Sequence, residues 1–113
     1  MYIRCAFFRG HVKPGCQATF DSHIQEHLVP LWTRFPHVQE VRVLHEVESD
    51  SADTHLEMVL AMRFPSREAI AEALDSATRY ESREASKRLF ELFDGDVFHT
   101  VFSADQFPLP AGG

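Results

Sequence analysis

The sequence is poor in the features that mark several large classes of protein. Lysine and arginine number 11 against 17 aspartates and glutamates, and the net charge of −6 argues against a nucleic-acid-binding surface. The two cysteines form neither a CxxC pair nor a zinc-ligand pattern. No apolar run has the length of a membrane span, and the first nine residues are too short and too charged for a secretory signal. We therefore expect a cytoplasmic protein with free thiols and no membrane partner.

Motifs for bound cofactors are also missing. There is no glycine-rich phosphate loop, no nucleophile elbow and no CxxCH haem-attachment motif. The pair His23-x-x-x-His27 has the spacing of a zinc motif but lacks the glutamate after the first histidine. We expect neither a metal nor an organic cofactor. The basic side chains of the second half, Arg79 and Arg83 among them, are spread among acids, which is typical of solvated helix faces.

The sequence does contain enough apolar residues for a core and a legible order of elements. Hydrophobic residues make up 44% of the 113, which is typical of one folded domain. The periodicity of apolar residues predicts helices over 18–35, 67–76 and 82–93, and strands over 2–9, 38–48, 55–64 and 97–103. This β-α-β-β-α-β order predicts an α+β, ferredoxin-like domain over residues 1–103, with helices on one face of an antiparallel sheet. Residues 104–113 are expected to form a C-terminal tail.

Three residues are expected to shape the helices. Pro30 lies inside the first helix, where it removes one backbone hydrogen bond and bends the second half. Ser66 has the position of a helix cap, and Gly95 has the position of a residue that ends the last helix.

The predicted strands carry apolar side chains on both faces. Leu60 and Met62 lie on one face of the strand over 55–64, while Val59 and Ala61 make the other face apolar, and the outer strands place phenylalanines on both sides. A sheet covered by helices on one side does not need a second apolar face. We therefore expect the second face to pack on another copy of the chain about a two-fold axis, which gives a homodimer.

Two histidines lie one turn apart on the first helix. Its buried stripe is defined by five apolar positions, namely Phe20, Ile24, Leu28, Leu31 and Phe35. At about 100° per residue, His27 falls inside this stripe and His23 at its edge. We expect His27 to point inward and His23 to meet solvent or the rim of a pocket.

A third histidine lies on the second predicted strand. His45 shares a strand face with Val41, Val43 and Val47, and this face is expected to meet the helices. His27 and His45 are therefore predicted to converge as catalytic residues in a small apolar cavity between the first helix and the sheet. There an imidazole can move a proton from an acidic carbon or a phenol. The alternative is that each histidine is a core residue with one satisfied hydrogen bond.

Three further residues are candidates for binding a substrate. Arg4 on the first strand can bind an anionic or carbonyl oxygen, although strand ends and dimer contacts also use arginine. His99 lies on the last strand, on the opposite face from Phe98, and is expected to join the cavity. His23 completes this set from the rim.

The pattern of motifs resembles the small EthD-like proteins, named for ethyl tert-butyl ether degradation, of the dimeric α/β-barrel superfamily. The resemblance covers residues 2–102 and rests on a Lys-Pro-Gly turn after the first strand and on scattered positions along the helix and second strand. These positions are Phe20, His23, Glu26, Pro30, Leu31, Pro36 and His45. Members often have tryptophan at the position of Ile24 and histidine at that of Leu28, where this chain differs.

The resemblance implies a dimeric α/β barrel and leaves two classes of function open. One is a cofactor-independent monooxygenase, isomerase or cyclase that acts on a small apolar or aromatic carbonyl compound by histidine-mediated proton transfer. The other is a non-catalytic dimeric binding or accessory protein of a catabolic pathway. An enzyme requires a polar cluster inside an apolar pocket, whereas an accessory protein predicts a cavity filled by Phe, Leu and Met.

Overall fold

The computed structural model describes residues 1–111 and contains one four-stranded sheet. Neighbouring strands are all antiparallel, in the order β2-β3-β1-β4. The strands are β1 (Tyr2–Val12), β2 (Glu40–Leu44), β3 (Leu56–Phe64) and β4 (Phe93–Ser103). Strand β1 pairs with β3 on one side and with β4 on the other, so the side chains of β1 lie in the middle of the sheet.

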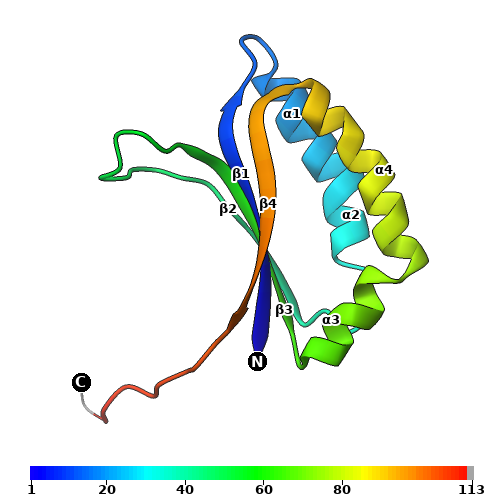
Figure 1. Cartoon of the computed structure of the whole chain (residues 1–113), viewed down its shortest axis with the longest axis vertical. Coiled ribbons are helices and arrows are strands. Elements are labelled where there is room, and N and C mark those ends of the chain that lie inside the picture. Colours follow the sequence, from blue (N-terminus) through cyan, green and yellow to red (C-terminus); the bar gives the residue numbers. More distant parts are fainter. Residues whose placement is uncertain (112–113) are drawn as a thin grey trace.

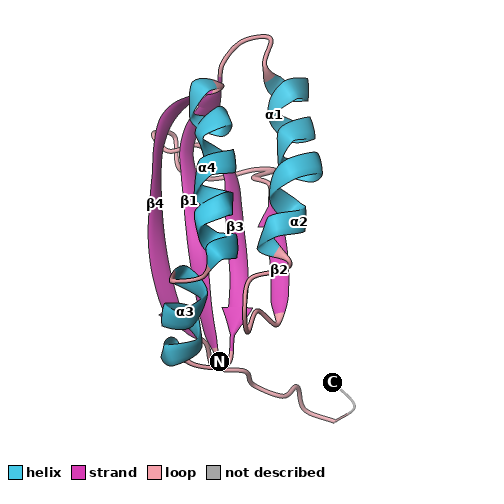
Figure 2. Ribbon diagram, turned by 90° about the vertical axis from the view of Figure 1, so that its right-hand side faces the viewer, coloured by secondary structure: helices cyan, strands magenta, loops and turns pink. Residues whose placement is uncertain are grey.

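Helices cover one face of this sheet and leave the other without a helix (Figures 1 and 2). They are α1 (Gln17–His23), the π-helical turn η1 (Ile24–Leu28), α2 (Val29–Trp32), α3 (Arg67–Leu74) and α4 (Ala77–Glu91). The β-α-β-β-α-β order and the α+β, ferredoxin-like class predicted from the sequence are confirmed. No helix of the described residues is long and apolar enough to span a membrane.

The core lies between the helices and the sheet. Alternate residues of β3, from Met58 to Phe64, point toward the helices and are buried, because side chains along a strand alternate between its faces. All five positions of the predicted helical stripe are buried as well. Apart from Leu31, the residues of these two apolar surfaces belong to one continuous cluster.

The effect of Pro30 on the helix is larger than the bend predicted from the sequence. The residue has no backbone N–H to donate four residues back, and the chain forms the wider turn η1 just before it, in which the Val29 N–H bonds the Ile24 carbonyl. Each residue of a π-turn advances by a smaller angle than in an α-helix, so every later side chain is rotated. The rotation brings Trp32 into the core, where it is 3% exposed, and turns His27 outward.

The ends of several elements differ from the sequence prediction. Ser66 caps α3 as expected, accepting the Ala69 N–H, but α4 begins five residues early because Ser76 caps it by accepting the Arg79 N–H. Strand β2 is shorter than predicted and ends at Leu44.

Gly95 does not end a helix; it lies inside β4, opposite Gly10 of β1. The backbones approach so closely there that a Cβ on Gly95 would lie 2.0 Å from the Arg9 carbonyl oxygen, and one on Gly10 would lie 2.2 Å from that of Asp94. Both glycines have positive φ, at 155° and 139°. The pair therefore lets β4 begin directly after α4 and stay paired with β1 over its whole length.

The face of the sheet away from the helices is apolar at its centre, and we call it the outer face. Its central residues are Ile3, Cys5, Phe7, Val59, Ala61, Phe98 and Phe102. Phe7 stacks on Phe98 with ring centroids 5.0 Å apart, and Phe98 and Phe102 remain 38% and 45% exposed. The second apolar face predicted from the strands is thus present and uncovered within the described chain.

The predicted tail begins where β4 ends. Residues 104–110 form neither helix nor strand and run away from the sheet (Figure 1), while positions 112 and 113 of the predicted tail lie outside the described residues. The division into a domain over 1–103 and a tail over 104–113 stays a prediction.

Candidate functional site

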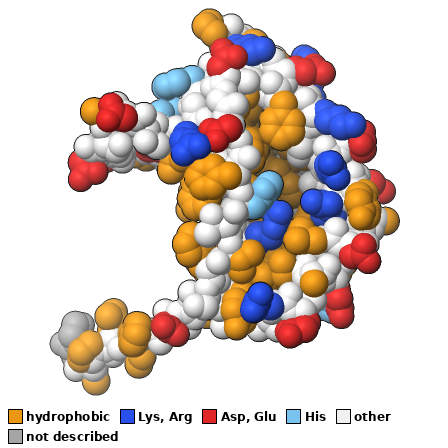
Figure 3. All heavy atoms as spheres, viewed as in Figure 1, with side chains coloured by type: hydrophobic (Ala, Val, Ile, Leu, Met, Phe, Trp, Pro, Cys, Tyr) orange, Lys and Arg blue, Asp and Glu red, His pale blue; other side chains and the backbone are white. Residues whose placement is uncertain are grey.

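A cavity of about 360 Å³ lies between the helix-facing side of the sheet and helix α4. In the space-filling view it is the hollow where basic side chains and a histidine gather over apolar atoms (Figure 3). Its lining residues come from β1, β3, β4, α4 and the region of α2. They are Arg4, Ala6, Phe8, Trp32, Phe35, Leu60, Met62, Arg79, Ser82, Arg83, Ser86, Phe90, Val97 and His99.

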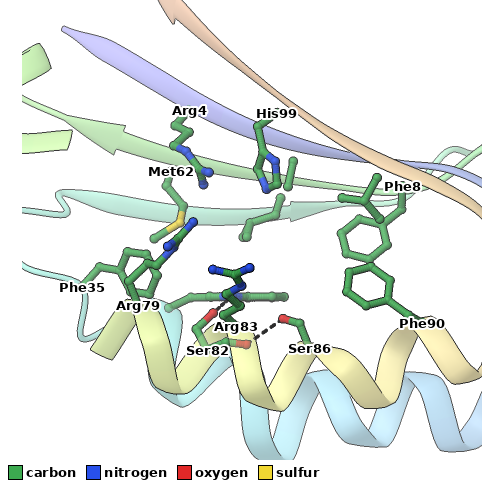
Figure 4. Close-up of a pocket in the computed structure, with 14 residues that line it drawn as sticks. Arg4, Phe8, Phe35, Met62, Arg79, Ser82, Arg83, Ser86, Phe90 and His99 are labelled. Atoms are coloured by element: carbon green, nitrogen blue, oxygen red, sulfur yellow. Dashed lines mark hydrogen bonds between the residues drawn. The ribbon is translucent and has the colours of Figure 1, made fainter. Parts of the chain in front are cut away.

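Two polar side chains enter this cavity from the sheet. Arg4 on β1 and His99 on β4 share the helix-facing side, because Ala6 pairs with His99 and Arg4 pairs with Val101. They are therefore diagonal neighbours across adjacent strands. Both extend from the sheet toward helix α4 (Figure 4).

The surroundings of His99 favour its neutral form. Its ring lies over the cavity, where burial lowers the pKa below the ordinary value, and the positive charges of Arg4 and Arg79 lower that pKa further. The residue as a whole is still exposed, because β4 is the edge strand of the sheet. A neutral imidazole at the open side of an apolar cavity can accept a proton at pH 7.

Two more guanidinium groups face the sheet from helix α4. Arg79 and Arg83 are four residues apart and so lie on the same side of the helix, as do Ser82 and Ser86 (Figure 4). The serine hydroxyls are already bonded: Ser82 accepts the indole N–H of Trp32 at 3.2 Å, and Ser86 donates to the Ser82 carbonyl at 2.8 Å. The arginines are the cationic donors on the helical wall.

Two of the three predicted substrate-binding residues line the cavity, and the third does not. Arg4 and His99 both line the cavity. His23 is half-buried but lies elsewhere, where its Nε2 donates to the Ala85 carbonyl at 2.7 Å and joins the first helix to α4. Its geometry is that of a histidine with one satisfied hydrogen bond.

The predicted orientations of His27 and His45 are wrong. His27 is exposed because the π-turn before Pro30 rotates it off the buried stripe. His45 is exposed because β2 ends at Leu44, which leaves His45 in the connection to β3 instead of on the helix-facing side. Neither histidine lines the cavity, so the two do not face each other across it. Their catalytic role stays a prediction that their exposure does not favour.

Arg79, Arg83 and Trp32 were not identified from the sequence as site residues. The sequence places the two arginines on a solvated helix face, because basic and acidic residues alternate around them. The Ser76 cap, three residues before Arg79, is the signal that places them on α4. The inward turn of Trp32 depends on the π-turn. Among the described residues, no group of three or more His, Cys, Asp or Glu side chains is arranged to hold a metal ion.

No model of a known protein family matches the chain, and no curated protein matches it. Solved structures nevertheless match almost its whole length. An ethyl tert-butyl ether (EthD) family protein from Bacillus halodurans is 17% identical with a TM-score of 0.74, over 93% of this chain and 99% of that one.

Two further matches are oxygenases by name. SnoaB, a cofactor-independent oxygenase from Streptomyces nogalater solved as a mutant, is 20% identical with a TM-score of 0.62 over 94% of this chain and 95% of that one. An antibiotic biosynthesis monooxygenase is 12% identical with a TM-score of 0.63 over 94% of this chain and 100% of that one. The resemblance to EthD-like proteins inferred from the sequence is therefore confirmed at the level of structure: the chain has the ferredoxin-like fold found in an EthD family protein and in these two oxygenases.

Proposed function

We propose that this chain is a cofactor-independent enzyme in which His99 removes a proton from a small apolar or aromatic carbonyl compound. The observation that carries the proposal is the convergence of a neutral imidazole and the Arg4 guanidinium in one apolar cavity. The imidazole acts as general base toward an acidic C–H or a phenol, and Arg4 stabilises the enolate or phenolate that forms. Such an anion is the first intermediate of isomerisation, cyclisation and cofactor-independent oxygenation alike.

The arrangement of polar groups favours this enzyme over the non-catalytic alternative. An accessory protein would fill the space with apolar side chains and satisfy its histidines locally, as His23 is satisfied by Ala85. His99 and Arg4 instead have no such bond among the described residues and border open volume. The name of SnoaB, a cofactor-independent oxygenase with the same fold, supports the reaction class.

We further propose that the enzyme is a homodimer joined through the outer face and that it works in the cytoplasm. The outer face is self-complementary in charge as well as apolar. Arg63 lies near one end of β3, where its Nη1 is 4.0 Å from Glu40 and its Nε is buried without a hydrogen-bond partner among the described residues, and Glu57 lies near the other end. A two-fold axis across the strands brings these opposite ends together. Cys5 and Cys16 are free thiols, as a reducing compartment allows.

Replacing His99 with glutamine tests the catalytic proposal. We expect turnover of aromatic carbonyl and phenolic compounds to fall by about 10²–10⁴-fold, the usual contribution of a positioned base. His45→Gln is the matched control, because His45 is exposed outside the cavity. The measurement is product formation by chromatography with each purified variant. Loss of turnover in His45→Gln alone would restore the sequence-based assignment, and binding without any turnover would favour the accessory protein.

The pH dependence of kcat/KM gives a second test. Because burial and two arginines lower the pKa of His99, its imidazole stays unprotonated at pH 7 and is lost as a base only in acid. We expect kcat/KM to be level around neutral pH and to fall along an acidic limb whose midpoint lies below about 6.5, the ordinary histidine value. The acidic limb should disappear in His99→Gln. An activity that requires a protonated imidazole, and therefore rises toward acid, is the opposite result.

A further inference from the structure

Three guanidinium groups border one cavity from opposite walls. Arg4 reaches in from β1, while Arg79 and Arg83 reach in from α4 (Figure 4). No aspartate or glutamate is among the lining residues found in the described part of the chain. The cavity is thus a concentration of positive charge in a protein whose net charge is −6.

The same helix treats its other basic residues differently. Lys87 pairs with Glu84 at 3.0 Å and Arg88 pairs with Glu91 at 2.8 Å, both three residues apart on the exposed side. None of the ion pairs within residues 1–111 involves the arginines of the cavity. Helix α4 therefore neutralises its solvent-facing cations and leaves its cavity-facing cations open.

Gathering these like charges beside one apolar cavity has an energetic cost. Arg4 is half-buried and lines the same cavity as Arg79, and both its burial and the positive charge of Arg79 lower its pKa. The remaining walls are apolar, from Phe8, Trp32 and Phe35 in particular. An occupant with an anionic group and an apolar body would relieve the repulsion and cover these walls at once.

We propose that the ligand of this cavity is a small organic carboxylate, whose negative charge is bound by Arg4 of the sheet together with Arg79 and Arg83 of α4. A planar carboxylate matches the paired N–H donors of a guanidinium, and a single negative charge is less costly to desolvate against apolar walls than a phosphate dianion. The inference rests on the proposed function only in taking this cavity as the site. Taken with the proposed function, the inference means that the substrate is a carbonyl compound that also carries a carboxylate.

Ligands of similar shape but different charge test whether the negative charge of the ligand determines its affinity for the cavity. The probes are 3-phenylpropionate, its neutral amide and phenyl phosphate, titrated into the full chain at low salt. Binding is measured by calorimetry and by the fluorescence of Trp32, the only tryptophan in the sequence and part of the cavity wall. We expect the carboxylate to bind at least about tenfold more tightly than the amide, with the difference shrinking as salt is added. Equal affinity for acid and amide, tighter binding of phenyl phosphate, or no binding of the carboxylate at millimolar concentration would overturn the inference.

Arginine variants test whether the preference for a carboxylate comes from the cavity. Arg4→Met should weaken binding of 3-phenylpropionate by about tenfold or more and leave the amide unaffected. Arg83→Met, at an exposed helix position that can be changed without disturbing the core, should act in the same direction. Arg88→Met removes an equal charge from the other side of α4 and should change binding less than twofold. An equal loss in Arg88→Met would reduce the effect to general electrostatics and contradict the proposed site.

The two proposals fail in different ways. Tight, arginine-dependent binding of carboxylates without turnover would remove the enzyme and keep the ligand class. Turnover of neutral carbonyl compounds that depends on His99, with acid and amide bound equally, would keep the enzyme and remove the ligand class.

Discussion

Gly95→Ala is expected to destabilise the protein by about 3–5 kcal/mol, a large part of the stability of a small domain. A Cβ at this position would lie 2.0 Å from the Arg9 carbonyl oxygen and 2.9 Å from the Gly10 Cα, which are backbone atoms of the central strand. Neither atom can move without separating β1 from β4. The φ of 155° adds backbone strain for any residue with a side chain. Urea or thermal denaturation followed by circular dichroism measures the loss.

Gly15→Ala is the matched control for this prediction. Gly15 also has a positive φ, at 80°, but a Cβ there meets no atom within 4 Å. Its substitution should therefore cost only the backbone term, about 1–2 kcal/mol. A loss in Gly95→Ala no greater than that in Gly15→Ala would show that β1 and β4 separate easily at this point.

Phe98→Glu is expected to convert the proposed homodimer to monomer. Phe98 lies on the edge strand β4 in the apolar part of the outer face, 38% exposed, stacked on Phe7 and with the Arg9 guanidinium 5.0 Å from its ring centroid. Burying a carboxylate between two apolar faces is costly, and the two-fold axis repeats the cost in both subunits. We expect the dimer dissociation constant to rise by about a thousandfold or more, which corresponds to about 4 kcal/mol. Analytical ultracentrifugation over a range of protein concentrations measures the change.

Tyr80→Glu is the control for surface charge, because Tyr80 is 49% exposed on α4, away from the outer face. It should leave the dimer intact. Thermal denaturation of the Phe98→Glu monomer should show that the fold survives, since Phe98 is not part of the buried core. A wild-type chain that sediments as a monomer at every concentration would contradict the dimer directly.

The fold could be predicted from the sequence because the pattern of buried residues that specifies each helix and strand is local and repeats along the element. The alternation that buries Met58, Leu60, Met62 and Phe64 is visible in the order of residues, and so is the stripe from Phe20 to Phe35. Each such pattern is supported by several side chains, so one misplaced boundary does not change the order of elements. The same redundancy made the uncovered apolar face of the sheet predictable.

The positions of the candidate site residues could be predicted only in part, because the position of a single side chain is not supported by a repeating pattern. Arg4 and His99 lie on the strand faces that alternation predicts, since each lies within a strand whose alternation continues on both sides, and their binding role stays a prediction. His27 and His45 do not lie as predicted, since each depends on one local event: the π-turn forced before Pro30 and the end of β2 at Leu44. A rotation by a fraction of a turn, or the loss of strand pairing, is enough to move a side chain out of a cavity.

The sequence by itself therefore determined the α+β class, the order of strands and helices and the two apolar faces of the sheet, because periodic burial is written along the chain. Only the tertiary structure decided which polar residues share a cavity. Arg4, Arg79 and His99 come from three elements far apart in sequence, and their convergence depends on how β1 pairs with β4 and how α4 crosses the sheet. That convergence, with no carboxylate beside it among the lining residues of the described chain, is what points to an anionic ligand.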